Sequence, residues 1–457
     1  MTRQILACDA LFDGLTWHAP ACIEIAGGVV HSVSAGTQGA AERVPGVIVP
    51  GIPNLHSHAF QRAFAGLTER SSGAGRDSFW SWREAMYRFA SRLDPDAVEA
   101  IAEQVFLEML EAGYTSVAEF HYVHHQADGS PYQDIAELGR RVCAAARSAG
   151  IRMTLLPVFY EAAGFGPQPI EPAQRRFYNT AERYLELWRA LSRECDELIT
   201  LGAAPHSLRA APLGSLNAVV REVKRVAPQA PIHIHVAEQL REVEECLAHH
   251  GQRPVELLLD GAAVDESWCL VHATHLETRE QVALAGSGAI AGLCPTTEAN
   301  LGDGFFPLGN FREARGRWGI GSDSQISVDP AQELRLLEYG QRLVQHARNT
   351  VLRGDREQHT GTELLSEALL GGAQALGSPV GRLLPGCLAD LVCLDAAHPG
   401  LVARSPAEQL DSWVFACNRP AIARVMVAGN WLVTGGSHAR REAVQRRFER
   451  CLTRLQS

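Results

Sequence analysis

The chain has 457 residues, of which 46% are hydrophobic and 21% are charged, a balance typical of folded domains. Its formal net charge of −10 argues against nucleic acid or an anionic membrane as a partner, and no apolar run approaches the ~18 residues of a membrane span. The N-terminus has no signal-peptide pattern, and the eleven cysteines form no Cys-x-x-Cys pair. We therefore expect a cytoplasmic enzyme with reduced thiols.

Eight short runs rich in hydrophobic and β-branched residues lie between positions 47 and 376, mostly separated by amphipathic helical patterns. The runs are Val47–Ile52, Ser116–Val123, Met153–Tyr160, Ile199–His206, Pro231–Glu238, Trp268–Leu276, Ala289–Thr296 and Trp318–Ser324. This alternation predicts an α/β fold, a (β/α)8 TIM-like barrel over residues 49–377. An open doubly wound sheet is the competing fold, but no Gly-x-Gly-x-x-Gly follows any run.

The clearest helix is expected to begin after Asp94, a good N-cap followed by Pro95, and to end at Gly113. Further helices are expected at 134–149, 174–195, 215–226, 330–347 and 362–376. The segment 59–93 is expected to be a long irregular loop that forms a lid or a binding wall, because loops of this length in compact domains are usually functional.

The two ends of the chain contain short strand patterns with glycine-rich turns. Residues 1–48 and 378–437 are each too short for a core of their own, so we expect them to form one small β-sandwich together. Ala428-Gly429-Asn430 predicts a hairpin. Residues 438–457 are expected to form a C-terminal helix.

Histidines and acidic residues end four of the eight runs. Because the carboxyl ends of barrel strands meet at one rim, these side chains are expected to lie together. Imidazole and carboxylate ligands suit Zn²⁺ best, with Fe²⁺ possible. The absence of Cys-x-x-Cys and His-Glu-x-x-His excludes the cysteine-ligated nucleobase deaminases and the zincin proteases. The residues are His56, His58, His235, Glu238, His272 and Asp323.

These motifs, together with Pro50-Gly51 and the segment 386–392, resemble the amidohydrolase superfamily in its deaminase and chlorohydrolase branch. The resemblance implies a homodimer with one divalent metal ion per site. The branch with two metal ions uses a carboxylated lysine, whereas the fourth run here ends Ala204-Pro205-His206. The resemblance implies that the metal ion is bound by His56, His58, His235 and Asp323. It also implies that Glu238 transfers protons and that His272 and Asp323 are catalytic residues as well.

Longer segments resemble one family in that branch, the N-formimino-L-glutamate deiminases. The resemblance implies hydrolysis of N-formimino-L-glutamate to N-formyl-L-glutamate and ammonia, a step of histidine degradation. The segments are His58–Ala63, Asp77–Glu84, Glu119–His125, Ala204–Arg209 and Cys294–Gly302.

A small substrate with two carboxylates needs cationic partners. Arg209, just after the fourth run, is expected to bind a carboxylate through its guanidinium fork. His206, Gln61, Arg83 and Tyr122 are further candidate substrate contacts. Among the other histidines, His233 is expected to fill the barrel or support a ligand, and the pair at 249–250 to be solvated.

Two other functions stay open on the sequence alone. One is deamination of a guanine- or adenosine-type heterocycle at the same metal site, for which Trp80 and Trp82 could supply stacking surfaces. The other is a catalytically silent barrel that acts as a scaffold. That function predicts lost metal ligands, whereas the sequence retains all of them.

Overall fold

The computed structural model describes residues 3–36, 41–70, 77–166, 168–353 and 358–456. Met1-Thr2 and residues 71–76 of the expected loop lie outside this part of the chain. No helix within it combines the length and hydropathy that a membrane crossing requires. The eleven cysteines all lie inside it, and each is a free thiol.

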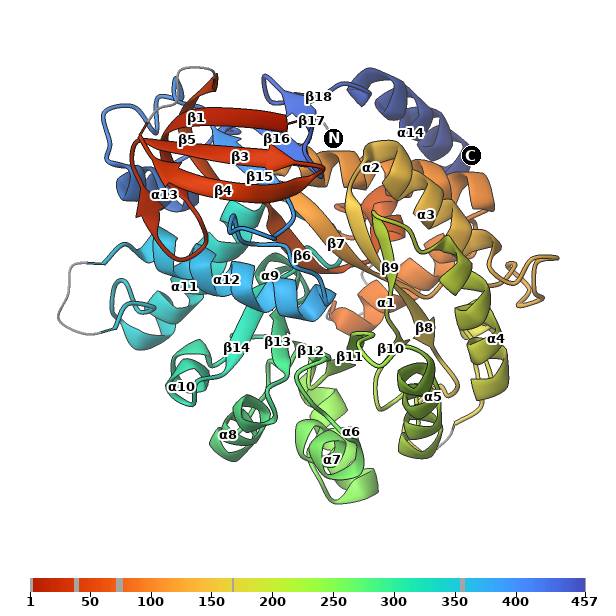
Figure 1. Ribbon diagram of the computed structural model, residues 1–457. Helices are drawn as coiled ribbons and strands as arrows, with labels where there is room; N and C mark the ends of the chain where they lie inside the picture. The colour runs from red at the N-terminus through yellow and green to blue at the C-terminus, as the bar shows by residue number, and fades with distance from the viewer. Residues whose placement is uncertain (1–2, 37–40, 71–76, 167, 354–357, 457) are drawn as a thin grey trace.

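Two parallel sheets form the centre of the described structure (Figure 1). The first sheet consists of β6 (Ile52–Ser57), β7 (Tyr114–His121), β8 (Arg152–Phe159), β9 (Ile199–Leu201) and β10 (Ala204–Pro205). The second consists of β11 (Ile232–Val236), β12 (Trp268–His272), β13 (Ile290–Leu293) and β14 (Arg317–Ile320). The expected α/β fold with parallel strands is confirmed.

Isolated parallel bridges connect these two sheets at both edges. Ala203 pairs with Ile232 on one side, and Ser57 pairs with Asp323 on the other. Every residue of β7 and β8 is buried, as expected for parallel strands covered on both faces. Because the strands are parallel, their carboxyl ends bring distant segments to one rim.

Helices lie outside these strands, and several of them match the predicted positions (Figure 1). In α2 (Pro95–Ala112), the Asp94 carboxylate accepts a hydrogen bond from the Ala97 N–H at 2.8 Å, and Gly113 ends the helix with φ 103°. The other predicted helices are α3 (Glu137–Ala149), α4 (Ala181–Leu191), α5 (Leu213–Val226), α11 (Pro330–Gln345), α12 (Thr360–Leu376) and α14 (Arg441–Gln456). Helices that the patterns missed are α6 (Leu240–His250), α7 (Pro254–Gly261), α8 (Thr278–Ser287), α9 (Pro295–Leu301), α10 (Leu308–Glu313) and α13 (Pro406–Phe415).

Four expectations need correction. The run Val47–Ile52 is divided at Gly51: its first part belongs to β5 (Glu42–Pro50), and the rim strand is β6. The run Ile199–His206 is divided between Leu201 and Ala204 into two short strands, β9 and β10, which pair with β8 in the same register. The helix expected at 174–195 is only α4, because Thr180 caps its start. The segment 59–93 contains a 3₁₀ turn at 59–64 and a helix, α1 (Phe79–Ala90).

Both ends of the chain contribute to one further sheet, which in the described residues has nine strands (Figure 1). The predicted hairpin joins β16 (Ile422–Val427) to β17 (Asn430–Thr434), with Ala428 and Gly429 at positive φ. The remaining strands are β1 (Arg3–Phe12), β2 (Trp17–His18), β3 (Ala21–Ala26), β4 (Val29–Ala35), β5, β15 (Leu391–Leu394) and β18 (Ser437–His438).

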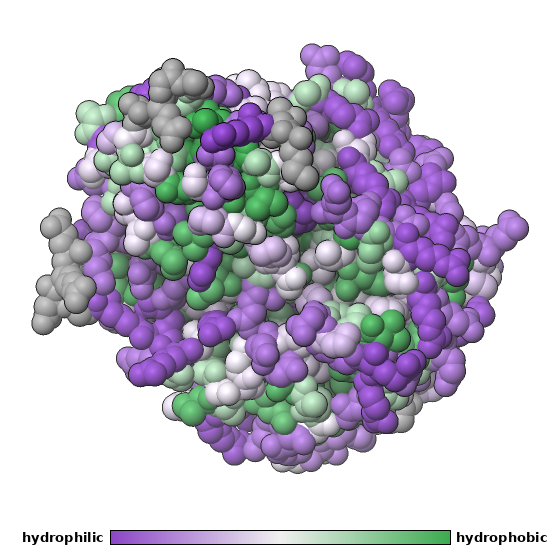
Figure 2. All heavy atoms as spheres, viewed as in Figure 1, coloured by the Kyte–Doolittle hydropathy of each residue, from purple (hydrophilic) through white to green (hydrophobic). Residues whose placement is uncertain are grey.

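The large apolar side chains lie mainly inside the molecule, between the parallel strands and their helices. On the face drawn in Figure 2, hydrophobic residues form scattered groups among hydrophilic ones. A second, smaller group of buried residues from β1, β3, β5 and β15 packs separately within the terminal sheet. The parallel strands that form the rim are therefore well packed against their helices.

Candidate metal centre and adjoining pocket

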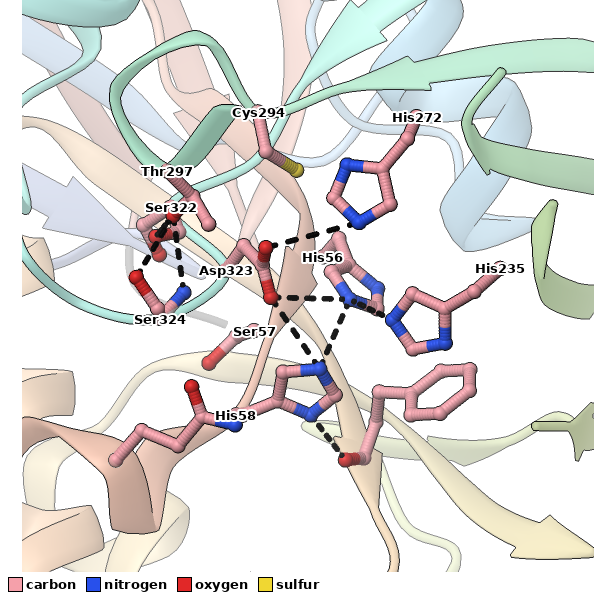
Figure 3. A network of polar contacts seen from close by, with 12 residues as sticks. His56, Ser57, His58, His235, His272, Cys294, Thr297, Ser322, Asp323 and Ser324 are labelled. Atoms are coloured by element: carbon pink, nitrogen blue, oxygen red, sulfur yellow. Dashed lines mark hydrogen bonds and ion pairs between the residues drawn. The ribbon is translucent and has the colours of Figure 1, made fainter. Parts of the chain in front are cut away.

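Four predicted ligands converge at the carboxyl ends of β6, β11 and β14. His56, His58, His235 and Asp323 each offer one ligand atom, all within 4.8 Å of one another and all buried. The Nε2 atom of His56 lies 3.2 Å from that of His58 and 3.0 Å from that of His235. Asp323 Oδ1 lies 3.4 and 3.3 Å from the first two Nε2 atoms (Figure 3). Ligand atoms bound to one ion at about 2.0–2.1 Å have separations of this size.

The hydrogen bonds of the outer ring nitrogens fix how these histidines face one another. His58 Nδ1 donates to the Phe120 carbonyl at 2.9 Å, and His235 Nδ1 donates to the His206 carbonyl at 3.0 Å. Burial lowers the pKa of all three imidazoles, so they are neutral at pH 7. The Nε2 lone pairs of His58 and His235 then point into the space that His56 Nε2 also faces, which suits a cation at that point. The residues therefore fit a divalent metal ion.

Backbone strain is concentrated at the same rim. Ala237, His272, Ala273, Asp323 and Gln325 all have positive φ, from 46° to 67°. Non-glycine residues adopt this conformation at a cost, and such strain clusters at functional sites. Here it turns the chain sharply at the ends of β11, β12 and β14, so that Asp323 joins the three histidines and His272 lies beside them.

Glu238 and His272 lie beside the ligand cluster. His272 Nε2 is 3.7 Å from Glu238 Oε1 and 3.8 Å from Asp323 Oδ2. On its other side, His272 Nδ1 lies 3.3 Å from Glu298 Oε1. Burial alone would lower the pKa of His272, but the surrounding carboxylates raise it to about 10. Burial raises the pKa of Glu238 to about 7, although His272 and Arg209 act in the opposite direction.

A pocket opens next to these groups. Its wall combines His58, His235, Glu238, His272 and Asp323 with every substrate contact predicted from the sequence. Those contacts are Gln61, Arg83, Tyr122, His206 and Arg209. The pocket is completed by aromatic and apolar side chains, among them Phe79 and Trp82 from α1, so the segment expected to be a loop forms part of the wall.

Two arginines give this pocket its cationic character. Their guanidinium carbons lie 4.5 Å (Arg83) and 5.8 Å (Arg209) from the centroid of the same Trp80 ring. The closest carboxylate oxygen recorded for Arg209 is Glu242 Oε2, at 4.0 Å. The Nε atoms of both arginines are buried and have no hydrogen-bond partner among the described residues. Both side chains therefore retain donors for a ligand.

Gln61 and Tyr122 form a polar pair in the wall. Gln61 Nε2 donates to the Tyr122 hydroxyl oxygen at 2.9 Å, and Tyr122 O–H contacts Met86 Sδ at 3.5 Å. Gln61 Oε1 is buried and lacks a partner within the described part of the chain. His206 lies nearby, and burial and Arg209 lower its pKa well below the ordinary value. These groups are neutral and can donate or accept hydrogen bonds.

Three buried acids that support the site were given no role by the sequence reasoning. Glu119 accepts hydrogen bonds from Ser57 Oγ at 2.5 Å and the Ala59 N–H at 2.7 Å. Glu242 accepts from the N–H groups of residues 237 and 238, each at 3.3 Å. Glu298 faces His272. The available signal was a charged residue inside an apolar strand for Glu119 and the spacing of four from Glu238 for Glu242.

The other histidines lie away from the ligand cluster or bond to the backbone. His233 Nε2 donates to the Ala375 carbonyl at 2.8 Å and so connects β11 to α12. Within the described residues, this hydrogen bond is not made to any of the proposed metal ligands. His124 Nε2 donates to the Val158 carbonyl at 2.9 Å. His249 and His250 are exposed at the end of α6, as predicted.

Comparison with known proteins agrees with this architecture. The sequence model of the amidohydrolase family matches residues 47–432. A formimidoylglutamate deiminase of Pseudomonas aeruginosa is 50% identical over 416 residues, which are 91% of each chain. A 5-methylthioadenosine/S-adenosylhomocysteine deaminase of Natronomonas pharaonis is 26% identical over 90% of this chain and 87% of its own.

Among solved structures, an amidohydrolase from Brucella melitensis superposes with a TM-score of 0.93 at 44% identity, covering 99% of this chain and 100% of its own. The match thus includes both the parallel strands and the sheet formed by the two ends. This chain belongs to the amidohydrolase family.

Proposed function

We propose that this protein is a metal-dependent hydrolase of C–N bonds that converts N-formimino-L-glutamate and water to N-formyl-L-glutamate and ammonia, a step of histidine degradation. The observation that carries this proposal is the 50% identity, over 91% of both chains, to a formimidoylglutamate deiminase. The pocket supports it independently, because metal-ligating side chains and two arginines line the same cavity.

The proposed cofactor is one divalent ion held by His56, His58, His235 and Asp323. Three neutral imidazoles and a carboxylate favour Zn²⁺, and Fe²⁺ is the alternative. When bound, such an ion acts as a Lewis acid and lowers the pKa of a water molecule toward ~7.

Glu238 is the proposed proton shuttle. With a pKa of about 7, its carboxylate can accept a proton from the attacking water and deliver it to the nitrogen that leaves as ammonia. His272 Nε2 faces both Glu238 and Asp323, and the raised pKa of His272 keeps that nitrogen protonated. It can therefore donate a hydrogen bond to the formimino group while Asp323 helps to remove the proton from water.

The glutamate part of the substrate is proposed to lie against the arginines. Arg209 binds one carboxylate and Arg83 the second, because both retain free donors and both lie near the Trp80 ring. Gln61, Tyr122 and His206 supply neutral hydrogen bonds between the carboxylates and the reacting carbon. This arrangement positions the formimino carbon at a fixed distance from Glu238.

The direct test is ammonia release from N-formimino-L-glutamate, with the metal content measured on the same sample. We expect turnover that requires about one equivalent of metal per chain. A protein that holds its metal and releases no ammonia from this substrate would contradict the proposal.

Deamination of a guanine- or adenosine-type heterocycle is the second candidate. Trp82 and Phe79 line the pocket, and the Natronomonas relative acts on adenosine derivatives. Trp80, however, is covered by arginines, which leaves less aromatic surface for a base. Measuring ammonia release from both substrate classes under the same conditions separates the two functions. The scaffold function is disfavoured by the complete ligand set.

We also propose that the two parallel sheets form one closed (β/α)8 barrel and that the terminal strands form a β-sandwich. The bridges at both sheet edges support the first, and the separate group of buried residues supports the second. The proposed division is residues 1–48 with 378–437, then 49–377, then 438–457. A homodimer follows only from the family resemblance, and a cytoplasmic location is consistent with eleven free thiols.

A further inference from the structure

A second group of metal-ligating side chains lies beside the first. His272, Cys294 and Asp323 each offer a ligand atom within 4.8 Å of the others, and all three residues are buried. They come from the carboxyl ends of three neighbouring strands, β12, β13 and β14. Figure 3 shows the sulfur of Cys294 pointing toward the space between His272 and Asp323. The group combines a soft sulfur ligand with nitrogen and oxygen.

The two oxygens of Asp323 face different partners. Oδ1 lies 3.4 and 3.3 Å from His56 and His58, whereas Oδ2 lies 3.8 Å from His272 Nε2. His272 Nδ1 is directed at Glu298 instead, which leaves Nε2 for the side of Asp323. One carboxylate can therefore contribute a separate oxygen to each of two ions.

The thiol of Cys294 forms no hydrogen bond with any other described residue. Its side chain is fully buried, and none of the hydrogen bonds found in the described ranges involves Sγ. Only its backbone is engaged, through the N–H that donates to Glu298 Oε1 at 2.8 Å. A thiol selects zinc and other soft ions over magnesium, calcium or manganese.

We propose that His272 Nε2, Cys294 Sγ and Asp323 Oδ2 form a second, inhibitory site for a thiophilic divalent ion such as Zn²⁺. As the ion binds, the thiol of Cys294 and the protonated Nε2 of His272 each lose a proton to solvent, so that both atoms can act as ligands. The ion then holds His272 and Asp323, so neither can act on the substrate. The inhibition rests on the proposed function, whereas the binding site itself does not.

The binding test uses the full-length protein loaded with one equivalent of Zn²⁺ and then titrated with Co²⁺. We expect a second equivalent to bind and to produce a thiolate-to-cobalt charge-transfer band in the near ultraviolet. Cys294→Ala removes both the band and the second equivalent. Cys143→Ala, a buried cysteine in the distant α3, retains both. If Cys294→Ala does not fold, Cys294→Ser must also lose the band.

The functional test measures ammonia release with one equivalent of Zn²⁺ and then with an excess. Excess Zn²⁺ should reduce the activity of the wild type and Cys143→Ala about tenfold or more, but that of Cys294→Ala less than about twofold. Equal inhibition of all three proteins, or a charge-transfer band that survives in Cys294→Ala, overturns the site. If no variant acts on N-formimino-L-glutamate while the band depends on Cys294, the proposed function fails and the site stands.

Discussion

The carboxyl group of Glu238 is buried beside the proposed metal ligands, and its Oε1 lies 3.7 Å from His272 Nε2. A carboxyl whose pKa is about 7 can transfer a proton in both directions near neutral pH. Glu238→Gln keeps the size of the side chain but cannot carry the proton. We expect this variant to retain its metal and to lose about 10²-fold or more in turnover, measured by ammonia release and metal analysis. Near-normal turnover would contradict the shuttle role.

Arg209 is the proposed partner of a substrate carboxylate, and its buried Nε has no partner in the described structure. Arg209→Met should reduce kcat/KM for N-formimino-L-glutamate about 10²-fold, and far less for formamidine, which has no carboxylate. Arg241→Met is a matched control, because Arg241 also contacts Trp80 (4.3 Å) but does not line the pocket. Equal losses on both substrates would show that Arg209 does not bind carboxylate.

Glu119 connects three strand ends around the proposed metal ligands. It accepts from Ser57 Oγ, and Gln325 Nε2 donates both to Ser57 Oγ and to the Asp323 carbonyl, each at 2.9 Å. The chain of bonds thus links β7 to the ends of β6 and β14. Outer partners of this kind orient the ligands themselves.

We therefore expect Glu119→Ala to weaken metal binding about 10- to 100-fold, as measured by competition with a chelator. Glu119→Gln keeps an acceptor for the Ala59 N–H and should lose less. Unchanged affinity in Glu119→Ala would remove Glu119 from the support of the metal centre.

Asp94 joins α2 to the C-terminal helix α14. Its carboxylate caps Ala97 and lies 2.6 Å from Arg454. Burial alone would raise the pKa of Asp94, but these partners hold it below its ordinary value. Such a carboxylate stabilises the fold above its unfolded-state pKa, and this contribution is lost as the pH falls through the folded-state pKa.

Asp94→Ala should lower the free energy of unfolding by about 1 kcal/mol at pH 7, measured by denaturant titration, and by less at a pH below about 3. Asp94→Asn keeps an equally good cap but removes the ion pair with Arg454, so its free energy of unfolding shows how much of the effect comes from each. If the difference in unfolding free energy between the wild type and Asp94→Ala grew as the pH fell, the stabilising role of the ionised Asp94 carboxylate would be contradicted.

For the whole molecule, the sequence predicted the pattern of elements better than their limits. The Asp94-Pro95 start and the Ala428-Gly429 hairpin were located correctly, because single residues determine those local geometries. The break at Gly51 was missed because apolar residues continue on both sides of it, and only pairing with β15 assigns Val49 to the terminal sheet. Short helices such as α7 were not predicted, because a brief apolar segment shows no clear helical periodicity.

The convergence of the proposed metal ligands could be predicted because each lies at or just after the carboxyl end of a strand, and parallel strands bring these ends together. The supporting acids could not. Glu119 acts through Ser57, and Glu298 through His272, so their roles depend on contacts between residues far apart in sequence. The placement of Arg83 beside Arg209 similarly depended on a helix that the sequence did not predict.

The proposed metal centre also spans the two parallel sheets, because His56 and His58 come from β6 in the first sheet and the loop after it, and His235 comes from β11 in the second. An ion that binds only the folded chain stabilises it by about 2.7 kcal/mol when its free concentration is 100 times its Kd. Removal by a chelator should therefore lower the unfolding temperature, and added Zn²⁺ should restore it. His56→Ala should lose this response, whereas His249→Ala, at the exposed end of α6, should keep it. An unfolding temperature that is the same with and without metal would mean that the fold holds the three imidazoles together unaided.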